Sequence, residues 1–94
     1  MLFVLICTDK PDSLALRLAT RPAHLAYLDT VVVKGAGPFL DDAGNPNGSL
    51  VIIEAKDLAE AQAIAARDPY AQAGLFASVD VRPWKWLIKN PETA

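Results

Sequence analysis

The stretch Ala65-Ala66-Arg67-Asp68-Pro69-Tyr70-Ala71-Gln72-Ala73-Gly74-Leu75-Phe76 marks a junction between a helix and a strand. Its alanines favour a helix, and Asp68 before Pro69 predicts the end of that helix, because proline disfavours helical conformation in the preceding residue. Gly74 and the apolar residues after it predict a turn into a strand. Such a junction holds the Asp68 carboxylate in one place, either to fix the turn or to form a catalytic pair with His24, the only histidine.

The composition indicates one small globular domain over residues 1–94, with a loose tail at residues 89–94. Of the 94 residues, 52% are hydrophobic and 21% are charged. A monomer of this length buries only about 60–65% of its unfolded surface, so we expect a partner subunit to add stability. Cys7 is the only cysteine, and its position in an apolar run predicts a buried thiol.

Charge and hydropathy argue against two kinds of partner. Nine basic and eleven acidic residues give a net charge of −2 without a basic stripe, which argues against nucleic-acid binding. No segment approaches the roughly 18–20 apolar residues of a membrane span. Residues 1–7 are apolar but have no basic flank of the kind that precedes a signal peptide, so we expect a cytoplasmic protein.

Apolar runs and turn residues predict the order strand, helix, strand, strand, helix, strand. The helices begin after Asp12 or Ser13 and after Asp57, whose side chains can cap free backbone N–H groups. Residues 41–48 contain Asn-Pro and Asn-Gly pairs and predict a hairpin loop. We expect residues 35–40 to form a glycine-rich strand end. The expected strands cover residues 2–7, 30–33, 49–54 and 76–82. Pro83 cannot donate a ladder hydrogen bond, so we expect the end of the last strand to be at the edge of the sheet or beyond it.

The first helix contains a proline and one apolar face. Pro22 lacks the N–H group that would bond to Leu18, so we expect a kink or a restart near Arg21. At 100° per residue, His24 falls at the edge of the buried face, on the same side as Arg17 and Arg21. The buried face is a leucine stripe that we expect to pack on the sheet: Leu14, Leu18, Leu25 and Leu28.

This order of elements predicts a ferredoxin-like α+β domain, βαββαβ, with an antiparallel four-stranded sheet. Two helices cover only one face of such a sheet, yet the strands at residues 2–7 and 49–54 are apolar on both faces. We therefore expect a homodimer in which two sheets face each other. Trp84 and Trp86 are close together near the end of the last strand, and we assign them to the subunit interface.

A resemblance to a known family rests on five motifs in this order: Arg21-Pro22-Ala23-His24-Leu25, Ala36-Gly37-Pro38, Gly48-Ser49, Asp68-Pro69-Tyr70 followed by Ala73-Gly74-Leu75-Phe76, and Val81-Arg82-Pro83-Trp84. Over nearly its whole length the chain resembles the YciI-like family of YCII-related domains. The resemblance implies a ferredoxin-like fold and a dimeric α-β barrel similar to that of muconolactone isomerases. It also implies a pocket centred on a histidine and an aspartate, which by position are His24 and Asp68.

The chain departs from the family pattern between His24 and Gly37, where it is shorter by about one helical turn, or ~4 residues. This difference predicts that the first helix ends after Leu28 or that the connection to Val31 is unusually tight.

A histidine–aspartate pair suits general acid–base chemistry, because histidine accepts and returns protons near neutral pH. In this reading His24 is the acid and base, and Asp68 orients its ring. No serine or cysteine with a nucleophile signature accompanies the pair, and a single histidine argues against a dedicated zinc site. We expect no cofactor. The expected reaction is proton transfer on a small organic acid, of the isomerase or lyase type.

Six further residues are candidates for binding that substrate. Arg21 or Arg17 could hold a carboxylate through paired hydrogen bonds. Further contacts could come from Gly37, Pro38, Ser49 and Tyr70. Each of these also has a structural explanation: a solvated helix residue for the arginines, a turn aromatic for Tyr70, and the end of a hairpin for Ser49. The alternative function is a non-catalytic dimeric module that binds a small molecule or serves another enzyme.

Overall fold

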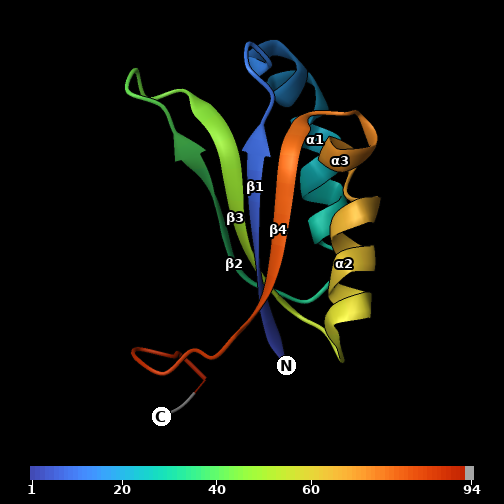
Figure 1. Cartoon of the computed structure of the whole chain (residues 1–94), viewed down its shortest axis with the longest axis vertical. Helices are drawn as coiled ribbons and strands as arrows, with labels where there is room; N and C mark the ends of the chain where they lie inside the picture. Colours follow the sequence, from blue (N-terminus) through green and yellow to red (C-terminus); the bar gives the residue numbers. More distant parts are fainter. Residues whose placement is uncertain (93–94) are drawn as a thin grey trace.

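A four-stranded antiparallel sheet carries three helices on one face (Figure 1). The computed structural model describes residues 1–92. Within this range no helix is long and apolar enough to cross a bilayer. The sheet has the order β2-β3-β1-β4, so the predicted ferredoxin-like α+β fold is confirmed. The elements are β1 (Leu2–Asp9), α1 (Leu14–Leu28), β2 (Val33–Leu40), β3 (Pro46–Glu54), α2 (Leu58–Arg67), the short α3 (Pro69–Gln72) and β4 (Phe76–Trp84).

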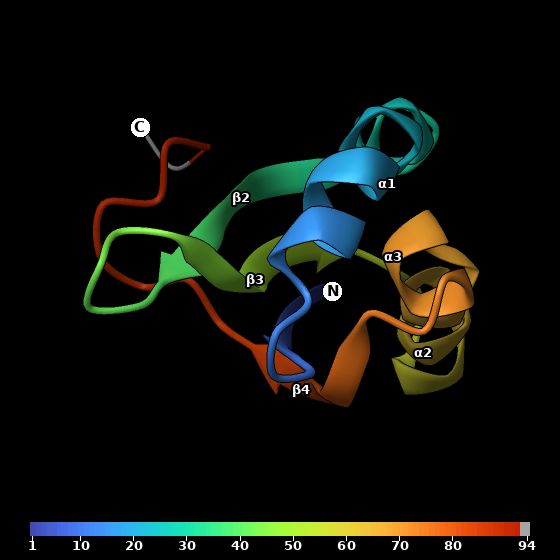
Figure 2. The same ribbon diagram turned by 90° about the horizontal axis from the view of Figure 1, so that it is seen from above.

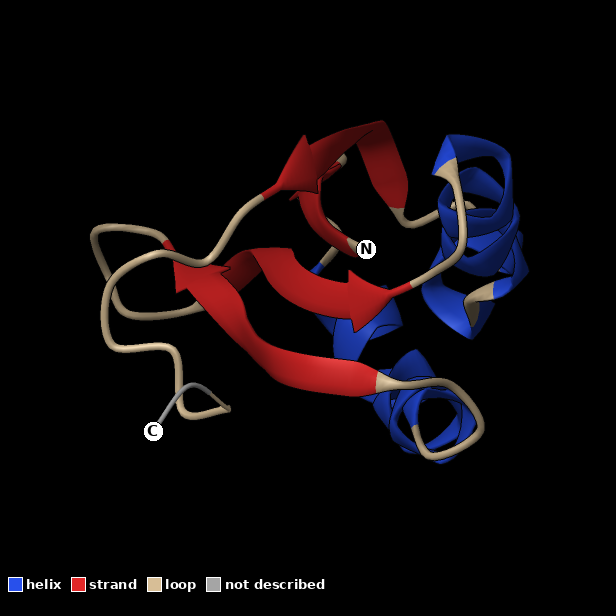
Figure 3. Ribbon diagram, turned by 90° about the horizontal axis from the view of Figure 1, so that it is seen from below, coloured by secondary structure: helices blue, strands red, loops and turns tan. Residues whose placement is uncertain are grey.

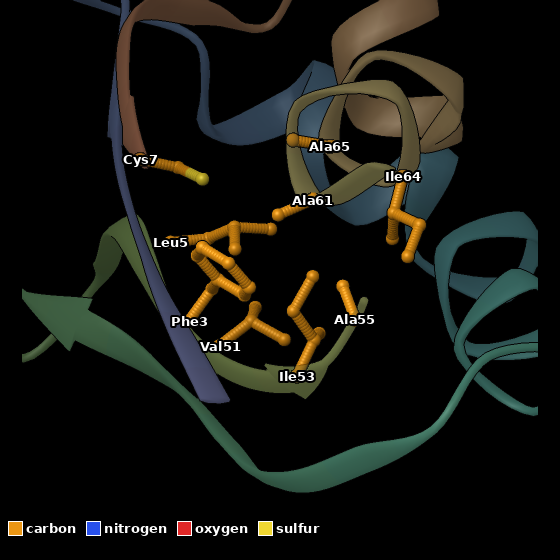
Figure 4. Packing of buried hydrophobic residues seen from close by; sticks show 9 residues of the cluster. All are labelled: Phe3, Leu5, Cys7, Val51, Ile53, Ala55, Ala61, Ile64 and Ala65. Carbon is orange, nitrogen blue, oxygen red and sulfur yellow. The ribbon is translucent and has the colours of Figure 1, made fainter. Parts of the chain in front are cut away.

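The core lies between the sheet and α2 (Figure 4). Alternate residues of a strand point to the same face, and those of β1 and β3 that face the helices are buried. Small residues on α2 let this helix lie close to the strands. The N-cap Asp57 accepts a hydrogen bond from the Glu60 N–H at 2.8 Å, as its position predicted. The cluster consists of Phe3, Leu5, Cys7, Val51, Ile53, Ala55, Ala61, Ile64 and Ala65.

Helix α1 runs without a break from Leu14 to Leu28 and includes Pro22. The predicted restart near Arg21 is therefore wrong. Pro22 removes one backbone hydrogen bond, but the turn that follows is held from outside the helix. His24 bonds to the residue between α2 and α3, and the Tyr27 hydroxyl donates to a carbonyl of α2 at 2.7 Å. These two tertiary bonds offset the missing backbone bond.

Most of the leucine stripe of α1 does not pack on the sheet, contrary to the prediction, although Leu28 at its end is half-buried against the core. Leu18 and Leu25 are 52% and 48% exposed, whereas Arg17 and His24 are 4% and 7% exposed. His24 is therefore buried rather than at the edge of the buried face. Both polar residues have carboxylate partners outside the helix, which stabilises them in the interior. These bonds set the rotation of α1 about its axis.

Strand β2 includes the glycine-rich stretch that we expected to end a strand. It begins at Val33, after a connection at residues 29–32, and Gly35 pairs with Ile52 of β3. The pairing of β2 with β3 is longer than predicted, because β3 begins at Pro46, which lies within the hairpin loop predicted for residues 41–48. Helix α1 ends at Leu28, which is one of the two outcomes that the short spacing predicted.

The face of the sheet opposite the helices is apolar at its centre. All three helices lie on the other side (Figure 2). Strand β4 is an edge strand, as Pro83 predicted. At its end, the Trp84 ring lies 5.3 Å from the Trp86 ring. The half-buried apolar residues of this open face come from the two central strands: Val4, Ile6, Leu50 and Ile52.

Residues 85–92 continue from β4 on the side of the sheet away from the helices (Figure 3). An ion pair between Glu92 and Lys34 of β2 joins this segment to the opposite edge of the sheet. The loose tail was predicted for residues 89–94, of which residues 93–94 lie outside the described residues.

Truncation of the central core residue Ile53 tests the packing of β3. We expect Ile53→Ala to lower the free energy of unfolding by about 2–4 kcal/mol, because Ile53 is fully buried and the change leaves a cavity. Ile88 is largely exposed, and Ile88→Ala is the matched control, with an expected change within about 0.5 kcal/mol. Urea denaturation at one protein concentration measures both. Equal losses in the two variants would contradict this description of the core.

Candidate active site

Asp68 joins α2 to α3 and holds the ring of His24. Its Oδ1 and Oδ2 atoms lie 2.9 and 2.8 Å from Nδ1 of His24. The same carboxylate accepts the Tyr70 N–H at 2.9 Å and so caps α3, where Pro69 is the first residue. An ionised carboxylate can only accept hydrogen bonds, so Nδ1 carries the hydrogen and Nε2 is left as the basic nitrogen. The backbone around Pro69 therefore fixes the tautomer of a side chain on α1.

The ring of Tyr70 contacts both His24 and Arg17. Its centroid is 4.0 Å from that of the His24 ring, with 19° between the planes, and 4.6 Å from the guanidinium carbon of Arg17. The second distance is typical of a cation–π contact. Burial raises the pKa of the Tyr70 hydroxyl, although Arg17 and Arg21 act in the opposite sense, so the phenol stays protonated at physiological pH. Tyr70 thus supports the His24 ring as a neutral stacking surface.

Arg17 is a buried cation that is balanced by Asp9. Its Nε donates to Asp9 Oδ2 at 2.6 Å, and its Nη2 donates to Asp9 Oδ1 at 2.8 Å and to Ser49 Oγ at 2.9 Å. Burial is the largest single influence on the pKa of Arg17 and would lower it, but the hydrogen bonds and charge of Asp9, together with Tyr70, more than reverse this effect and the pKa is raised. The charged guanidinium therefore ties the end of β1 to α1 and β3.

A cavity of about 220 Å³ opens beside these residues, between α1 and the strands β2 and β3. Its polar lining consists of Arg17, Arg21, His24, Ser49 and Tyr70. Among the described residues, Arg21 forms no ion pair, so it leaves a positive charge at the cavity that no carboxylate balances. The apolar lining comprises Leu18, Leu25, Leu28, Ala36, Gly37, Pro38, Pro46 and Val51.

The structure brings all seven predicted site residues together: His24, Asp68, Arg21, Gly37, Pro38, Ser49 and Tyr70. Six of them line the cavity, and Asp68 holds His24 from behind. The two arginines differ in their freedom to bind a ligand. Arg17 already uses Nε and Nη2 on neighbouring side chains, whereas Arg21 is exposed and unpaired among residues 1–92.

The sequence analysis missed Asp9 and assigned the apolar wall of the cavity to the core. Asp9 precedes Lys10 and Pro11, where it resembles an ordinary turn residue. The available signal was a carboxylate at the end of a buried strand, followed by an arginine in the first turn of the next helix. Leu18 and Leu25 gave no such signal, because helical periodicity does not say whether a stripe faces a sheet or a cavity.

Cys7 lies in the core near the site, and its predicted burial is confirmed. Burial, with a smaller contribution from Asp68, raises the pKa of the Cys7 thiol to about 12. The thiol is therefore neutral at physiological pH, which is the opposite of what an activated nucleophile needs. Residues 1–92 contain no cluster of three or more His, Cys, Asp or Glu side chains that could hold a metal ion.

Fold and site together define a ferredoxin-like α+β protein with a buried histidine–aspartate pair beside a cationic cavity. The model of the YCII-related domain matches residues 1–85, and the chain belongs to this family. Protein YciI of Escherichia coli O6:H1 is 44% identical over 95 residues, which cover 90% of this chain and 97% of that protein. An uncharacterized protein of Haemophilus influenzae is 38% identical over 96 residues, with the same two shares covered.

Two solved structures illustrate the range of this fold. One is 5-chloro-2-hydroxyhydroquinone dehydrochlorinase (TftG) from Burkholderia phenoliruptrix AC1100 in complex with 2,5-dihydroxybenzoquinone. It has a TM-score of 0.83 and 37% identity, and the match covers 90% of this chain and 94% of TftG. The other, an antibiotic biosynthesis monooxygenase, has a TM-score of 0.56 and 17% identity over 93% of this chain and 99% of its own. This second likeness shows the fold alone.

Removal of the charge on Asp9 tests the buried ion pair. We expect Asp9→Asn to lower the free energy of unfolding by about 3 kcal/mol, because Arg17 would stay buried without a balancing charge. Asp42 lies exposed in the hairpin turn, and Asp42→Asn is the matched control with little expected change. Denaturant unfolding at pH 7 and fixed protein concentration measures both variants. An Asp9→Asn protein as stable as the control would contradict a structural role for the pair.

Proposed function

We propose that this protein is a small enzyme that performs general acid–base proton transfer on a small organic acid, in a reaction of the isomerase or lyase type. One observation carries the proposal: His24 Nδ1 is bonded to both carboxylate oxygens of Asp68, while the ring lines a cavity that also contains Arg21, an arginine without an ion-pair partner among residues 1–92. A buried aspartate that fixes the tautomer and stabilises the protonated ring is the arrangement that a histidine base needs.

In the elimination form of the reaction, Nε2 of His24 takes a proton from the substrate carbon. The electron pair of the broken C–H bond forms the new double bond, and the leaving group departs with its own electron pair. Protonated His24 is stabilised by Asp68 and then returns its proton to water. In the isomerisation form, the same nitrogen returns the proton to another carbon of the substrate. Both forms leave the enzyme unchanged at the end of the cycle.

The lining of the cavity favours a small ligand with an anionic group and an apolar body. Arg21 is the cation that can pair with the anionic group, since Arg17 is already bonded to Asp9. Leu18, Leu25 and the strand residues opposite supply an apolar wall. TftG, at 37% identity, is a dehydrochlorinase, and the compound in its complex is a hydroxyquinone. Its similarity supports elimination from a ring that bears oxygen atoms.

The proposal includes a homodimer formed through the open face of the sheet. Val4, Ile6, Leu50 and Ile52 form a half-buried apolar surface there, and Phe39 is 42% exposed on the same face. A second copy packed against this surface would bury these apolar residues, which the helices on the other face of the sheet cannot cover.

Replacement of His24 tests the enzyme directly. We expect wild-type protein to release chloride from 5-chloro-2-hydroxyhydroquinone or from a small chlorinated carboxylic acid under anaerobic conditions. In His24→Ala, kcat should fall by a factor of 10²–10⁴, which is the usual contribution of a general acid–base residue. Added imidazole should restore part of the lost activity by supplying the missing base. Chloride release and NMR of the products measure both effects.

The control for this experiment is Tyr27→Phe, which removes a tertiary hydrogen bond from the same helix without touching the cavity. It should keep its turnover while losing some stability. If His24→Ala and Tyr27→Phe lose activity only in proportion to their loss of folded protein, His24 is a structural residue. Wild-type protein that binds these compounds and turns over none of them would support the non-catalytic binding module instead.

The dimer has its own test in solution. We expect light scattering to give twice the chain mass of 10.1 kDa for the wild type. Ile52→Glu should shift the mass toward that of the monomer, because a carboxylate would be buried between the two sheets. Leu58→Glu, at the exposed start of α2, is the control and should leave the mass unchanged. A wild type that stays at the monomer mass at high concentration would contradict the dimer.

A further inference from the structure

The Ser49 hydroxyl is a buried polar group in the cavity that faces a cation on one side. Ser49 is 4% exposed, lines the cavity, and has its Oγ 2.9 Å from Nη2 of Arg17. Arginine has only donors, so Ser49 must be the acceptor in this bond. A serine hydroxyl also has one hydrogen to donate, and among residues 1–92 no acceptor receives it. This hydrogen is therefore available to a ligand in the cavity.

Three contacts of the Arg17 guanidinium, in addition to its hydrogen bond to Ser49, fix the direction of that hydrogen bond. One hydrogen of Nη2 goes to Asp9 and the other goes to Ser49, while Nε is held by the second Asp9 oxygen. The guanidinium carbon also lies over the ring of Tyr70, 4.6 Å from its centre. An arginine held at all these points cannot turn away when a ligand enters. Its bond to Oγ polarises the serine O–H group, which makes that group a stronger donor.

We infer that Ser49 is the hydrogen-bond donor that stabilises the oxygen on which negative charge develops when His24 removes a proton. Asp9 and Arg17 are the positioning residues for this donor. The inference rests on the proposed function and deepens it by assigning a role and a substrate class. A preorganised donor aimed at a developing oxyanion is one of the largest contributions that a site of this kind can make.

The pairing of a base with this donor defines the class of substrate. The carbon that loses its proton must lie next to a carbonyl group, as in a ketone with an α-hydrogen or in the keto tautomer of a hydroxylated ring. The C–H electron pair then forms an enolate whose charge lies on the oxygen bonded to Ser49, and the proton lies on Nε2 of His24. The enolate collapses by expelling a leaving group or by taking the proton back at another carbon. Atoms and charge balance in both cases.

The probe for this site is 2,5-dihydroxybenzoquinone, an acidic hydroxyquinone that is anionic at neutral pH and absorbs visible light. We expect wild-type protein to bind it with a shift in its absorption spectrum. Ser49→Ala should bind it roughly 10- to 100-fold more weakly, as expected for loss of a hydrogen bond to a charged group. Ser49→Thr keeps the hydroxyl and should restore most of the affinity. Ser13 is bonded to a loop carbonyl outside the cavity, and Ser13→Ala is the matched control.

Ser49→Cys is a second variant, in case Ser49→Ala does not fold. It has nearly the same shape, but its thiol is a weak donor, so it should also bind the probe weakly and lack the spectral shift. With a turned-over substrate, the loss in both variants should fall mainly on kcat, by roughly 10²-fold or more, because the oxyanion forms during the reaction.

The outcomes separate this inference from the proposed function. Folded Ser49→Ala or Ser49→Cys protein that binds the quinone within twofold of the wild type overturns the inference. Wild-type protein that fails to bind the quinone at millimolar concentration overturns it as well, because the donor is already in place without a ligand. Weakened binding in these variants together with no turnover by the wild type supports the Ser49 donor and contradicts the enzyme.

Discussion

The carboxylate of Asp68 is the constraint on which the site depends. It follows the last residue of α2, caps α3 through the Tyr70 N–H, and accepts the Nδ1 hydrogen of His24 from α1. One side chain therefore caps α3 directly after the end of α2 and orients a ring on α1. Pro69 fixes the backbone at the start of α3, so Asp68 has little freedom to move. The stacked Tyr70 ring restricts His24 in the remaining direction.

A second buried carboxylate, Asp9, determines which face of α1 points into the protein. Together with Asp68 it holds Arg17 and His24 in the interior, two turns apart on the same face of the helix. Leucines that would otherwise cover the sheet are turned toward the cavity, where they meet the glycine-containing strand β2. The cavity thus exists because two polar bonds prevent α1 from packing on the sheet through its most apolar face.

The polar groups of the site that lack a hydrogen-bond or ion-pair partner all belong to residues that line the cavity. Nε2 of His24, the guanidinium of Arg21 and the hydroxyl hydrogen of Ser49 have no partner among residues 1–92, whereas every side-chain nitrogen and oxygen in that range that is closed off from solvent has one. Several polar groups without partners surround a single cavity here, whereas a packing defect leaves an isolated polar group without a partner. This difference supports a ligand site, and the apolar open face of the sheet lies on the opposite side from it.

Much of the fold could be predicted from sequence because its signals are local. Asp57 and Asp68 mark helix ends through bonds to amides two or three residues away, and Pro83 on β4 indicated an edge strand. The family motifs also contain the seven residues that the structure places around or behind one cavity, although the resemblance itself pointed only to His24 and Asp68. Their catalytic and binding roles stay predictions.

The sequence by itself determined the element order, the helix ends and the identity of the polar residues. Tertiary structure alone decided the rotation of α1, its continuity through Pro22 and the pairing of Asp9 with Arg17. The pairing of Asp68 with His24 was predicted through the resemblance to a family, because no local pattern indicates it. The physical reason is distance along the chain. Asp68 and His24 are 44 residues apart, and no periodicity within a helix records which carboxylate will lie beside it. Once those bonds form, they outweigh the preference of the leucine stripe for the sheet.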